Sequence, residues 1–368
     1  MDEKARVLQA PLHRVVQPVE SPSSGKRPES VVYCRLPSDK IAVFFGRDLL
    51  PLLDPSGDPS LLDSVAQMRE HLAAELGFLC PGVRFRDTEV EPSHGYRIEV
   101  QESAVAEGVV YLDRLLALGS PEQLALLDGL ACTDPTYGVP CLWIARDLQE
   151  EAEGLGCLLV EPIGVILTHL TEVIRSHAAE LLGRGEVDVL LDTVKKNKTL
   201  GGLVKQLIPD PLPVYEVQEV FRNLLKERVS LRDMASILEA LIEKAPLTKD
   251  PERLTEFVRA ALSDSICQEY LDNQGAINAL VLEPDVEQSI ETLLRKFLPI
   301  PSEMGREILQ TLSEQVETLS QQGIQPILLS SAPARPVLRK LTEPSLPNLV
   351  VLSRSEIPPE IVVNCIFR

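Results

Sequence analysis

The hydrophobic pattern of this chain changes period twice, and this constrains its fold more than any other feature. Before about residue 165, segments such as GVRFRD (82–87) and GYRIEVQE (95–102) alternate apolar and polar residues, as half-buried strands do. Residues 165–245 instead carry apolar residues at helical spacing, and the C-terminal part alternates strand and helix patterns. Because the two patterns bury their apolar residues differently, we expect an α+β chain of several subdomains.

The region before residue 165 already mixes both patterns. Its predicted helix, LLDSVAQMREHLAAELGF (61–78), has one apolar stripe: Leu61, Val65, Met68, Leu72 and Leu76. Further predicted strands are IAVFF (41–45), CLWIA (141–145) and CLLVEP (157–162). We therefore expect an α/β first region.

The central section is the longest run of one pattern. Its predicted helices are GVILTHLTEVIRSHAAELLG (164–183), EVDVLLDTVKK (186–196), VYEVQEVFRNLLKE (214–227) and SLRDMASILEALIEKA (230–245), followed by DPERLTEFVRAALSDSICQEYL (250–271). The PDPLP segment at 209–213 separates two of them. The C-terminal part then has strand patterns at 276–284, 325–331, 348–357 and 361–368, with helix patterns between them. This order predicts a helical subdomain followed by an α/β one.

The net charge of the chain limits the kinds of macromolecule that it can bind. The 368 residues contain 36 Lys and Arg against 55 Asp and Glu, a formal charge of −19. Such a surface repels nucleic acid and anionic lipid, and 4% aromatic residues provide little base-stacking surface. We therefore expect no nucleic-acid partner. Basic or amphipathic protein partners fit better, although a solvated acidic surface explains the same composition.

Cysteine usage and hydropathy indicate the compartment. The seven cysteines are widely spread without a C-x-x-C pair, which suggests neither a zinc framework nor a disulfide scaffold, and a reducing cytosol is the simplest environment. No run approaches the ~20 apolar residues of a membrane helix. Residues 1–30, rich in Pro and Ser, are predicted to be a flexible linker.

One helix invites a metal hypothesis. THLTEVIRSHAAELL (168–182) contains two His-x-x-Glu pairs, His169 with Glu172 and His177 with Glu180. The two histidines lie eight residues apart, roughly 12 Å along a helix axis, so they cannot chelate one ion. We predict no metal and no cofactor.

Catalytic motifs are also missing from the sequence. It has no G-x-S-x-G elbow, no phosphate loop, no G-x-G-x-x-G after a strand and no cysteine in a recognisable catalytic motif. We predict no catalytic residue, and the sequence favours a role in binding or assembly over one in catalysis.

Several motifs in order do resemble a known family. TDPTYGVPCLWI (133–144), LLVEPIGVILTHLTEVIRSHAAELLG (158–183), FRNLLKERVSLRDMASILEAL (221–241) and KDPERLTEFVRAAL (249–262) resemble the cytosolic half of the type III secretion export-gate family. That family includes the flagellar protein FlhA and injectisome proteins of the LcrD and InvA kind. The resemblance implies four subdomains: an α/β first one with a small ferredoxin-like insert, a helical third and an α/β fourth.

On this resemblance we assign the following boundaries. Residues 1–30 are the linker from a membrane half that this sequence does not contain, 31–53 with 103–122 form subdomain 1, 54–102 form the ferredoxin-like subdomain 2, 123–247 form subdomain 3 and 248–368 form subdomain 4.

The resemblance also implies a function and a location. Members form a nine-membered ring on the cytoplasmic side of the bacterial inner membrane, receive chaperone–substrate complexes and work with export ATPase and stalk components. The polar side of the 168–182 helix supplies our candidate ring contacts: His169, Glu172, Arg175 and Glu180. The flagellar docking dimple maps onto Val65, Glu75, Phe78 and Val109.

Two physical interpretations of the dimple residues remain open. An exposed Phe78 in an apolar concavity beside Glu75 would suit an amphipathic partner helix. Helical periodicity alone assigns Val65 to the core and Phe78, after Gly77, to a hydrophobic contact at the helix end. Competing functions also remain open: an acidic enzyme with an unrecognised site, or a monomeric chaperone adapter. The sequence is compatible with a flagellar or an injectisome system.

Overall fold

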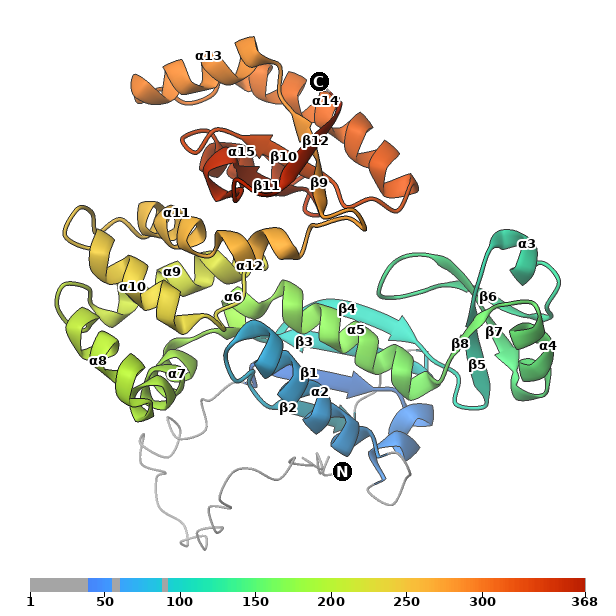
Figure 1. The fold of residues 1–368 in the computed structure, drawn as a ribbon. Helices are drawn as coiled ribbons and strands as arrows, with labels where there is room; N and C mark the ends of the chain where they lie inside the picture. The colour runs from blue at the N-terminus through green and yellow to red at the C-terminus, as the bar shows by residue number, and fades with distance from the viewer. Residues whose placement is uncertain (1–38, 55–59, 88–91, 368) are drawn as a thin grey trace, which may run out of the picture. The chain divides into compact units, whose positions relative to one another are not determined.

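The computed structural model describes residues 39–54, 60–87 and 92–367 (Figure 1). The linker predicted at 1–30 lies outside the described residues. The chain divides into two compact units, Met1–Val187 and Asp188–Arg368.

The first unit is built on a mixed sheet with the strand order β2-β1-β3-β4. Its strands are β1 (Ile41–Phe45), β2 (Val83–Asp87), β3 (Gly95–Val100) and β4 (Ser103–Val109). Strand β1 pairs parallel with β2 and antiparallel with β3, and β3 pairs antiparallel with β4. The short 3-10 helix η1 (Arg47–Leu53) follows β1.

Two helices, α2 (Leu61–Leu76) and α5 (Pro162–Ser176), lie side by side over one face of this sheet (Figure 1). The five residues of the predicted α2 stripe are the buried ones, which confirms the helical period expected for this segment. Gly77 ends α2 with φ of 83°, a left-handed conformation that glycine adopts without steric cost.

A second antiparallel sheet in this unit has the order β6-β7-β5-β8. Its elements follow the chain as β5 (Arg114–Leu118), α3 (Pro121–Leu124), β6 (Gly129–Thr133), β7 (Pro140–Ala145), η2 (Arg146–Leu148), α4 (Gln149–Gly154) and β8 (Leu158–Val160). The sequence βαββαβ with this strand order is the ferredoxin-like arrangement. It lies between β4 and α5 in the chain, so it is an insert in the first α/β subdomain, as the fold class predicted.

The position of the insert corrects our boundaries. We placed it at 54–102, but β2 and β3, which lie in that range, pair with β1 of the predicted first subdomain. The boundary at 122 likewise separates β5 from β7, although these strands pair along their length. Each strand pattern in the sequence shows a half-buried strand without showing its partner, and the partners here are distant in the chain.

The helix predicted at 164–183 is interrupted. Helix α5 ends at Ser176, His177 has φ −105° and ψ 13°, and the short α6 (Ala178–Leu181) follows. The ring Nδ1 of His177 lies 2.9 Å from the carbonyl oxygen of Val173, which also accepts the backbone N–H of His177. The side chain therefore competes for the helical acceptor at this position.

Helix α7 (Arg184–Lys196) spans the boundary between the units, and the helical part of the second unit follows it. That part contains α8 (Lys198–Leu207), α9 (Val214–Lys226), α10 (Met234–Lys244), α11 (Pro251–Ala261) and α12 (Ser263–Gln268). We did not predict α8, in which Gly201 and Gly202 weaken the helical signal. Pro251 occupies the first turn of α11, behind an Asp250 cap.

The C-terminal part of the second unit is a parallel sheet with the order β11-β10-β9-β12. Its elements are β9 (Ala276–Val281), α13 (Pro284–Arg295), α14 (Ser302–Gln321), β10 (Ile327–Ser330), α15 (Arg335–Thr342), β11 (Val350–Ser353), η3 (Arg354–Glu356) and β12 (Val362–Phe367). The core between sheet and helices includes Leu280, Ile290, Leu312 and Leu338. The alternating pattern predicted for this region is confirmed.

Candidate functional site

A hollow of about 450 Å³ opens in the first unit beside the ferredoxin-like insert. It is lined by Glu107, Gly108, Val109, Tyr111, Leu116, Leu130, Ala131, Cys132, Thr133, Asp134, Pro135 and Trp143. These residues come from β4, from the segment after it, and from β5, β6, β7 and the turn after β6. Of the residues predicted for partner docking, Val109 belongs to this lining.

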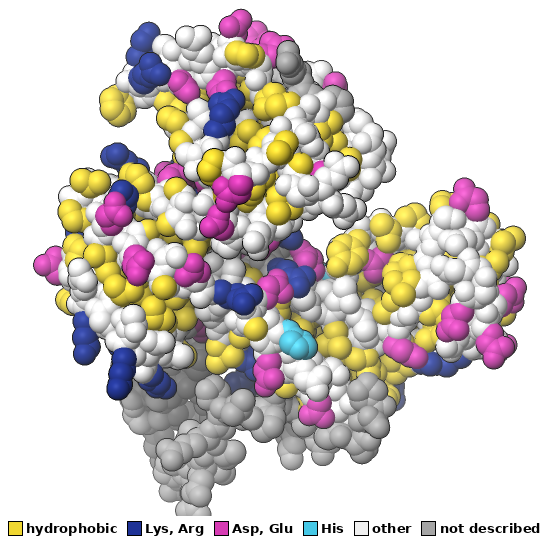
Figure 2. Space-filling model, in the orientation of Figure 1, with side chains coloured by type: hydrophobic (Ala, Val, Ile, Leu, Met, Phe, Trp, Pro, Cys, Tyr) yellow, Lys and Arg dark blue, Asp and Glu magenta, His cyan; other side chains and the backbone are white. Residues whose placement is uncertain are grey.

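One face of the insert sheet forms the wall of this hollow. Leu130 of β6 and Leu116 of β5 are both register partners of Trp143, so all three share a face. The neighbouring residues Leu142 and Ile144 point to the opposite face, where they pack into the core with elements that include α4. Because successive side chains of a strand point to opposite faces, one face of the insert sheet packs against the helices and the other lines the hollow. Figure 2 shows hydrophobic side chains gathered over this insert, with acidic ones along its outer edge.

Aromatic contacts hold the inner part of the wall. The rings of Tyr111 and Trp143 lie edge to face with centroids 5.7 Å apart, and His94 stacks on Tyr111 at 4.6 Å. Trp143 is only 2% exposed, whereas Leu130 is 42% exposed. The wall thus combines a fixed aromatic base with an exposed aliphatic side chain, the combination that protein partners use as an anchor point.

The turn between β6 and β7 is fixed by Asp134. Its carboxylate accepts the backbone N–H groups of Thr136 at 3.0 Å and Tyr137 at 2.6 Å, and its backbone pairs with Val139 and Gly138. Gly138 has φ of 69°, which a residue with a side chain rarely adopts. The TDPTYGVP motif therefore builds a rigid turn, and Asp134, 7% exposed, is committed to it.

A buried pair lies beneath β4. Tyr96 of β3 is within hydrogen-bond distance of His169 of α5, with 2.8 Å between Oη and Nδ1. Burial lowers the pKa of His169. Gly108 of β4 is the register partner of Tyr96, and a Cβ atom at Gly108 would lie 2.5 Å from the Tyr96 ring, so glycine is what leaves room for the ring beside β4.

The docking prediction is corrected in part. Val65 is 3% exposed and Phe78 is 2% exposed, so both belong to the core and the expected exposed Phe78 is wrong. Phe78 follows the glycine that ends α2, a position where a hydrophobic side chain packs back on its own helix. Glu75 is exposed, and the hollow is not lined by Val65, Glu75 or Phe78.

Of the candidate ring contacts, one is buried and the others lie on the polar face. His169, at 6% exposure, is inside the unit, so its assignment to the polar surface is wrong. Arg175 makes two hydrogen bonds to Glu75 of α2, at 2.6 and 2.9 Å, and lies 3.5 Å from Glu172. Glu180 is exposed. The surviving polar face of α5 and α6 thus carries Glu172, Arg175 and Glu180, with Arg175 held by a bidentate pair.

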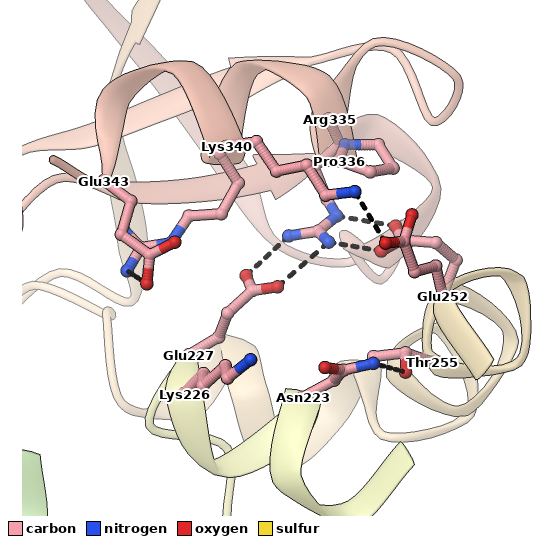
Figure 3. A pocket seen from close by; sticks show the side chains of 11 residues that line it. Asn223, Lys226, Glu227, Glu252, Thr255, Arg335, Pro336, Lys340 and Glu343 are labelled. Carbon is pink, nitrogen blue, oxygen red and sulfur yellow. Dashed lines mark hydrogen bonds and ion pairs between the residues drawn. The ribbon is translucent and has the colours of Figure 1, made fainter. Parts of the chain in front are cut away.

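A second pocket, of about 140 Å³, lies in the second unit over a buried cluster of ionic groups (Figure 3). Arg335 of α15 reaches both Glu227, at 2.6 and 3.1 Å, and Glu256 of α11, at 2.6 Å. Arg259 binds Glu356 at 2.6 Å and lies 3.3 Å from Glu227. These pairs join the helical part of the unit to its α/β part, and the arginines already hold carboxylates, so the cluster is structural.

Two arrangements are absent among the described residues: a cluster of metal ligands and a membrane-spanning helix. Across residues 39–54, 60–87 and 92–367, no three His, Cys, Asp or Glu side chains are arranged to hold a metal ion. Among the helices in those same ranges, none is both long and apolar enough to cross a bilayer.

Comparison with known proteins gives the chain a family. Residues 8–362 match the FHIPEP family. The flagellar biosynthesis protein FlhA of Bacillus subtilis is 35% identical over 346 residues, which is 93% of this chain and 51% of that protein. The chain thus spans about half the length of the curated relatives it matches.

Solved structures agree with this fold. The Chlamydia pneumoniae CdsV protein is 26% identical with a TM-score of 0.79, covering 89% of this chain and 97% of CdsV. CdsV has also been solved in complex with CdsO, at 24% identity and a TM-score of 0.75, again over 89% and 97% of the two chains. The nonameric EscV cytosolic domain from a type III secretion system is 19% identical with a TM-score of 0.69, covering 90% and 96%. Sequence and fold lead to one conclusion: this chain belongs to the FHIPEP family.

Proposed function

We propose that this chain is the cytoplasmic, ring-forming part of a type III protein export gate of the bacterial inner membrane, where it docks chaperone-bound substrates for export. Membership of the family that contains FlhA supports the export-gate role. The role is non-catalytic: the chain provides surfaces for assembly and docking. The hollow beside the insert is the single observation that carries the docking part.

Ring formation is supported by the nonameric EscV domain, which has the same fold. The polar face of α5 and α6 is our proposed contact, with Glu180 as its exposed acid and Arg175 held in place by Glu75. We expect Glu180→Arg to weaken assembly, because it reverses the charge that this face offers to a neighbouring subunit, and to leave the fold intact, because the side chain is exposed. Sedimentation at rising concentration measures this. A strictly monomeric wild-type protein at high concentration, together with a full-length protein that forms no nonamer, would refute the ring.

Docking in the hollow follows from its surface chemistry. Leu130, Val109 and the aromatic base offer apolar area, and the exposed Glu107 lies at the rim. An amphipathic helix with basic residues beside its apolar face is complementary to this surface, and the chain's charge of −19 favours its approach. We therefore place chaperone–substrate docking at the insert-side hollow, with Val109 retained from the sequence prediction.

The test compares two exposed leucines of the insert. Leu130→Glu places a charge inside the hollow, whereas Leu158→Glu changes a 65% exposed leucine on β8 that does not line it. We expect Leu130→Glu to weaken binding of a purified secretion chaperone–substrate complex at least about tenfold, the effect of losing one central anchor. Leu158→Glu should bind as wild type. Equal binding by both variants, with unchanged melting temperatures, would remove the hollow from the proposal.

A secretion-apparatus partner is the second part of the assembly we propose. The CdsV–CdsO complex supports a contact between such a domain and another component of the apparatus, and we extend it to export ATPase and stalk components here. The corresponding measurement is pull-down of those components with the assembled ring, which should be lost with Glu180→Arg if that variant no longer forms the ring.

A further inference from the structure

Two cysteines face one another across the wall of the hollow. Cys132 of β6 and Cys141 of β7 are direct register partners in the antiparallel pair. Directly opposed residues in antiparallel strands have Cα atoms about 4.5 to 5.5 Å apart, inside the range of about 4.4 to 6.8 Å that a disulfide spans. The backbone already has the separation that a bond between these residues needs.

The two cysteine side chains point toward each other. The two Sγ atoms lie 3.1 Å apart, and both residues are reduced. Cys141 is 3% exposed and Cys132 is half-buried, and Cys132 also lines the hollow. One thiol is therefore reachable from the hollow, and the other lies directly behind it.

We propose that Cys132 and Cys141 form a reversible disulfide across β6 and β7, made by exchange with a small disulfide such as oxidised glutathione that enters through the hollow. Nothing in the docking proposal requires this bond, and the bond does not require a partner.

The chemistry takes two exchanges. The Cys132 thiol loses its proton, and its sulfur attacks one sulfur of oxidised glutathione, forming a mixed disulfide and releasing one glutathione thiolate that takes up a proton. The Cys141 sulfur, after losing its proton, attacks Cys132 and releases the second glutathione. The two protein thiols lose two electrons, and oxidised glutathione gains them as two thiols.

The surroundings set the rate and the outcome. Burial raises the pKa of both thiols, so little thiolate is present at neutral pH and the first exchange is slow. The second exchange is intramolecular, between atoms already in contact, so the mixed disulfide does not accumulate. The bond closes the turn that Asp134 organises, and it restrains the wall made by β6.

Mass spectrometry of the folded, unmutated protein tests the proposal. The protein is incubated with oxidised glutathione, remaining thiols are blocked, and the digest is analysed without reductant. We expect a peptide in which Cys132 is bonded to Cys141, and its disappearance after dithiothreitol. The melting temperature measured from Trp143, which pairs with the same strand β6, should rise on oxidation and return on reduction.

Matched variants identify the order of attack. Cys141→Ser should stop at a stable glutathione adduct on Cys132, whereas Cys132→Ser should leave the shielded Cys141 free. The exposed Cys365 reports that the oxidant is active. The proposal is overturned if wild-type protein keeps both thiols free after Cys365 is fully modified, or accumulates the Cys132 adduct, or links either cysteine elsewhere. Because the decisive measurement uses the unmutated chain, a misfolded variant does not affect it.

Discussion

Replacing Arg335 by methionine tests how the second unit is held together. Arg335 is 1% exposed and its guanidinium binds two carboxylates, those of Glu227 and Glu256. Methionine retains much of the aliphatic volume, so the change removes the charge with little cavity. Breaking a buried pair by removing one partner costs about 3 to 5 kcal/mol, because a carboxylate remains desolvated.

The structure places the expected loss at the lower end of that range. The Glu227 and Glu256 side chains are 15% and 25% exposed, and Glu227 keeps Arg259 at 3.3 Å. We therefore expect Arg335→Met to lower the free energy of unfolding of this unit by about 3 kcal/mol. With a urea m value of about 2 kcal/mol per molar, the midpoint falls by about 1.5 M.

The loss of unfolding free energy in Arg335→Met should depend on pH. Burial alone would raise the pKa of Glu227, but Arg259 and Arg335 hold it below its ordinary value, while burial keeps that of Glu256 raised. Without Arg335 both pKa values rise. A carboxyl whose folded pKa is above its unfolded pKa loses stability as the pH increases. The deficit of the variant should therefore be largest at neutral pH and shrink as the pH falls towards about 4.

The chain provides an internal control for the assay. Its one tryptophan, Trp143, is in the first unit, so fluorescence follows that unit while far-UV circular dichroism follows both. Arg335→Met should shift a dichroism transition and leave the Trp143 transition in place. Arg295→Met removes a surface pair in which the arginine is 78% exposed and should cost about 0.5 kcal/mol. A loss below about 1 kcal/mol for Arg335→Met, or one independent of pH, would refute the reasoning.

Three further predictions concern the first unit, each followed by Trp143 fluorescence. Phe78→Ala should lower the free energy of unfolding by about 3 to 5 kcal/mol because Phe78 is 2% exposed. Leu79→Ala, at 56% exposure, should lower it by under about 1 kcal/mol, and similar losses for the two variants would mean that Phe78 is exposed. Gly108→Ala should cost about 1 to 3 kcal/mol by crowding Tyr96, and a neutral result would contradict the close approach. Because burial lowers the pKa of His169, unfolding takes up a proton as the pH drops below about 6.5, so stability should decline there and His169→Gln should reduce that decline. If stability declines equally in His169→Gln, other titrating groups cause the decline.

The sequence located most elements because their signals are local. The stripe on α2 and the alternation in β2 and β3 depend on residues that are neighbours in the chain, and the structure confirms each of them. Strands β4, β5 and β6 were not predicted. β4, SAVAEGV, is largely exposed and rich in small residues, so its alternation is weak.

The functional site was harder to predict, since its residues meet only after folding. Val109 was selected by resemblance, whereas Leu130 and Cys132 lie on β6 and Trp143 on β7, and their shared face follows from the register. The one available signal was the TDPTYGVP turn, which places β6 and β7 next to each other. Phe78 shows the converse: its sequence position fits both docking and core, and burial decided for the core.

By itself, the sequence determined most of the helices and strands, the helical middle between mixed ends, and the family to which the chain belongs. These depend on periods of two and 3.6 residues and on local motifs. Tertiary structure alone decided that β1 pairs with β2 and β3, that the insert begins after β4, that His169 is buried, and that Arg335 holds two distant carboxylates. Each of these depends on groups far apart in sequence, whose contact is settled by packing and desolvation of the whole unit.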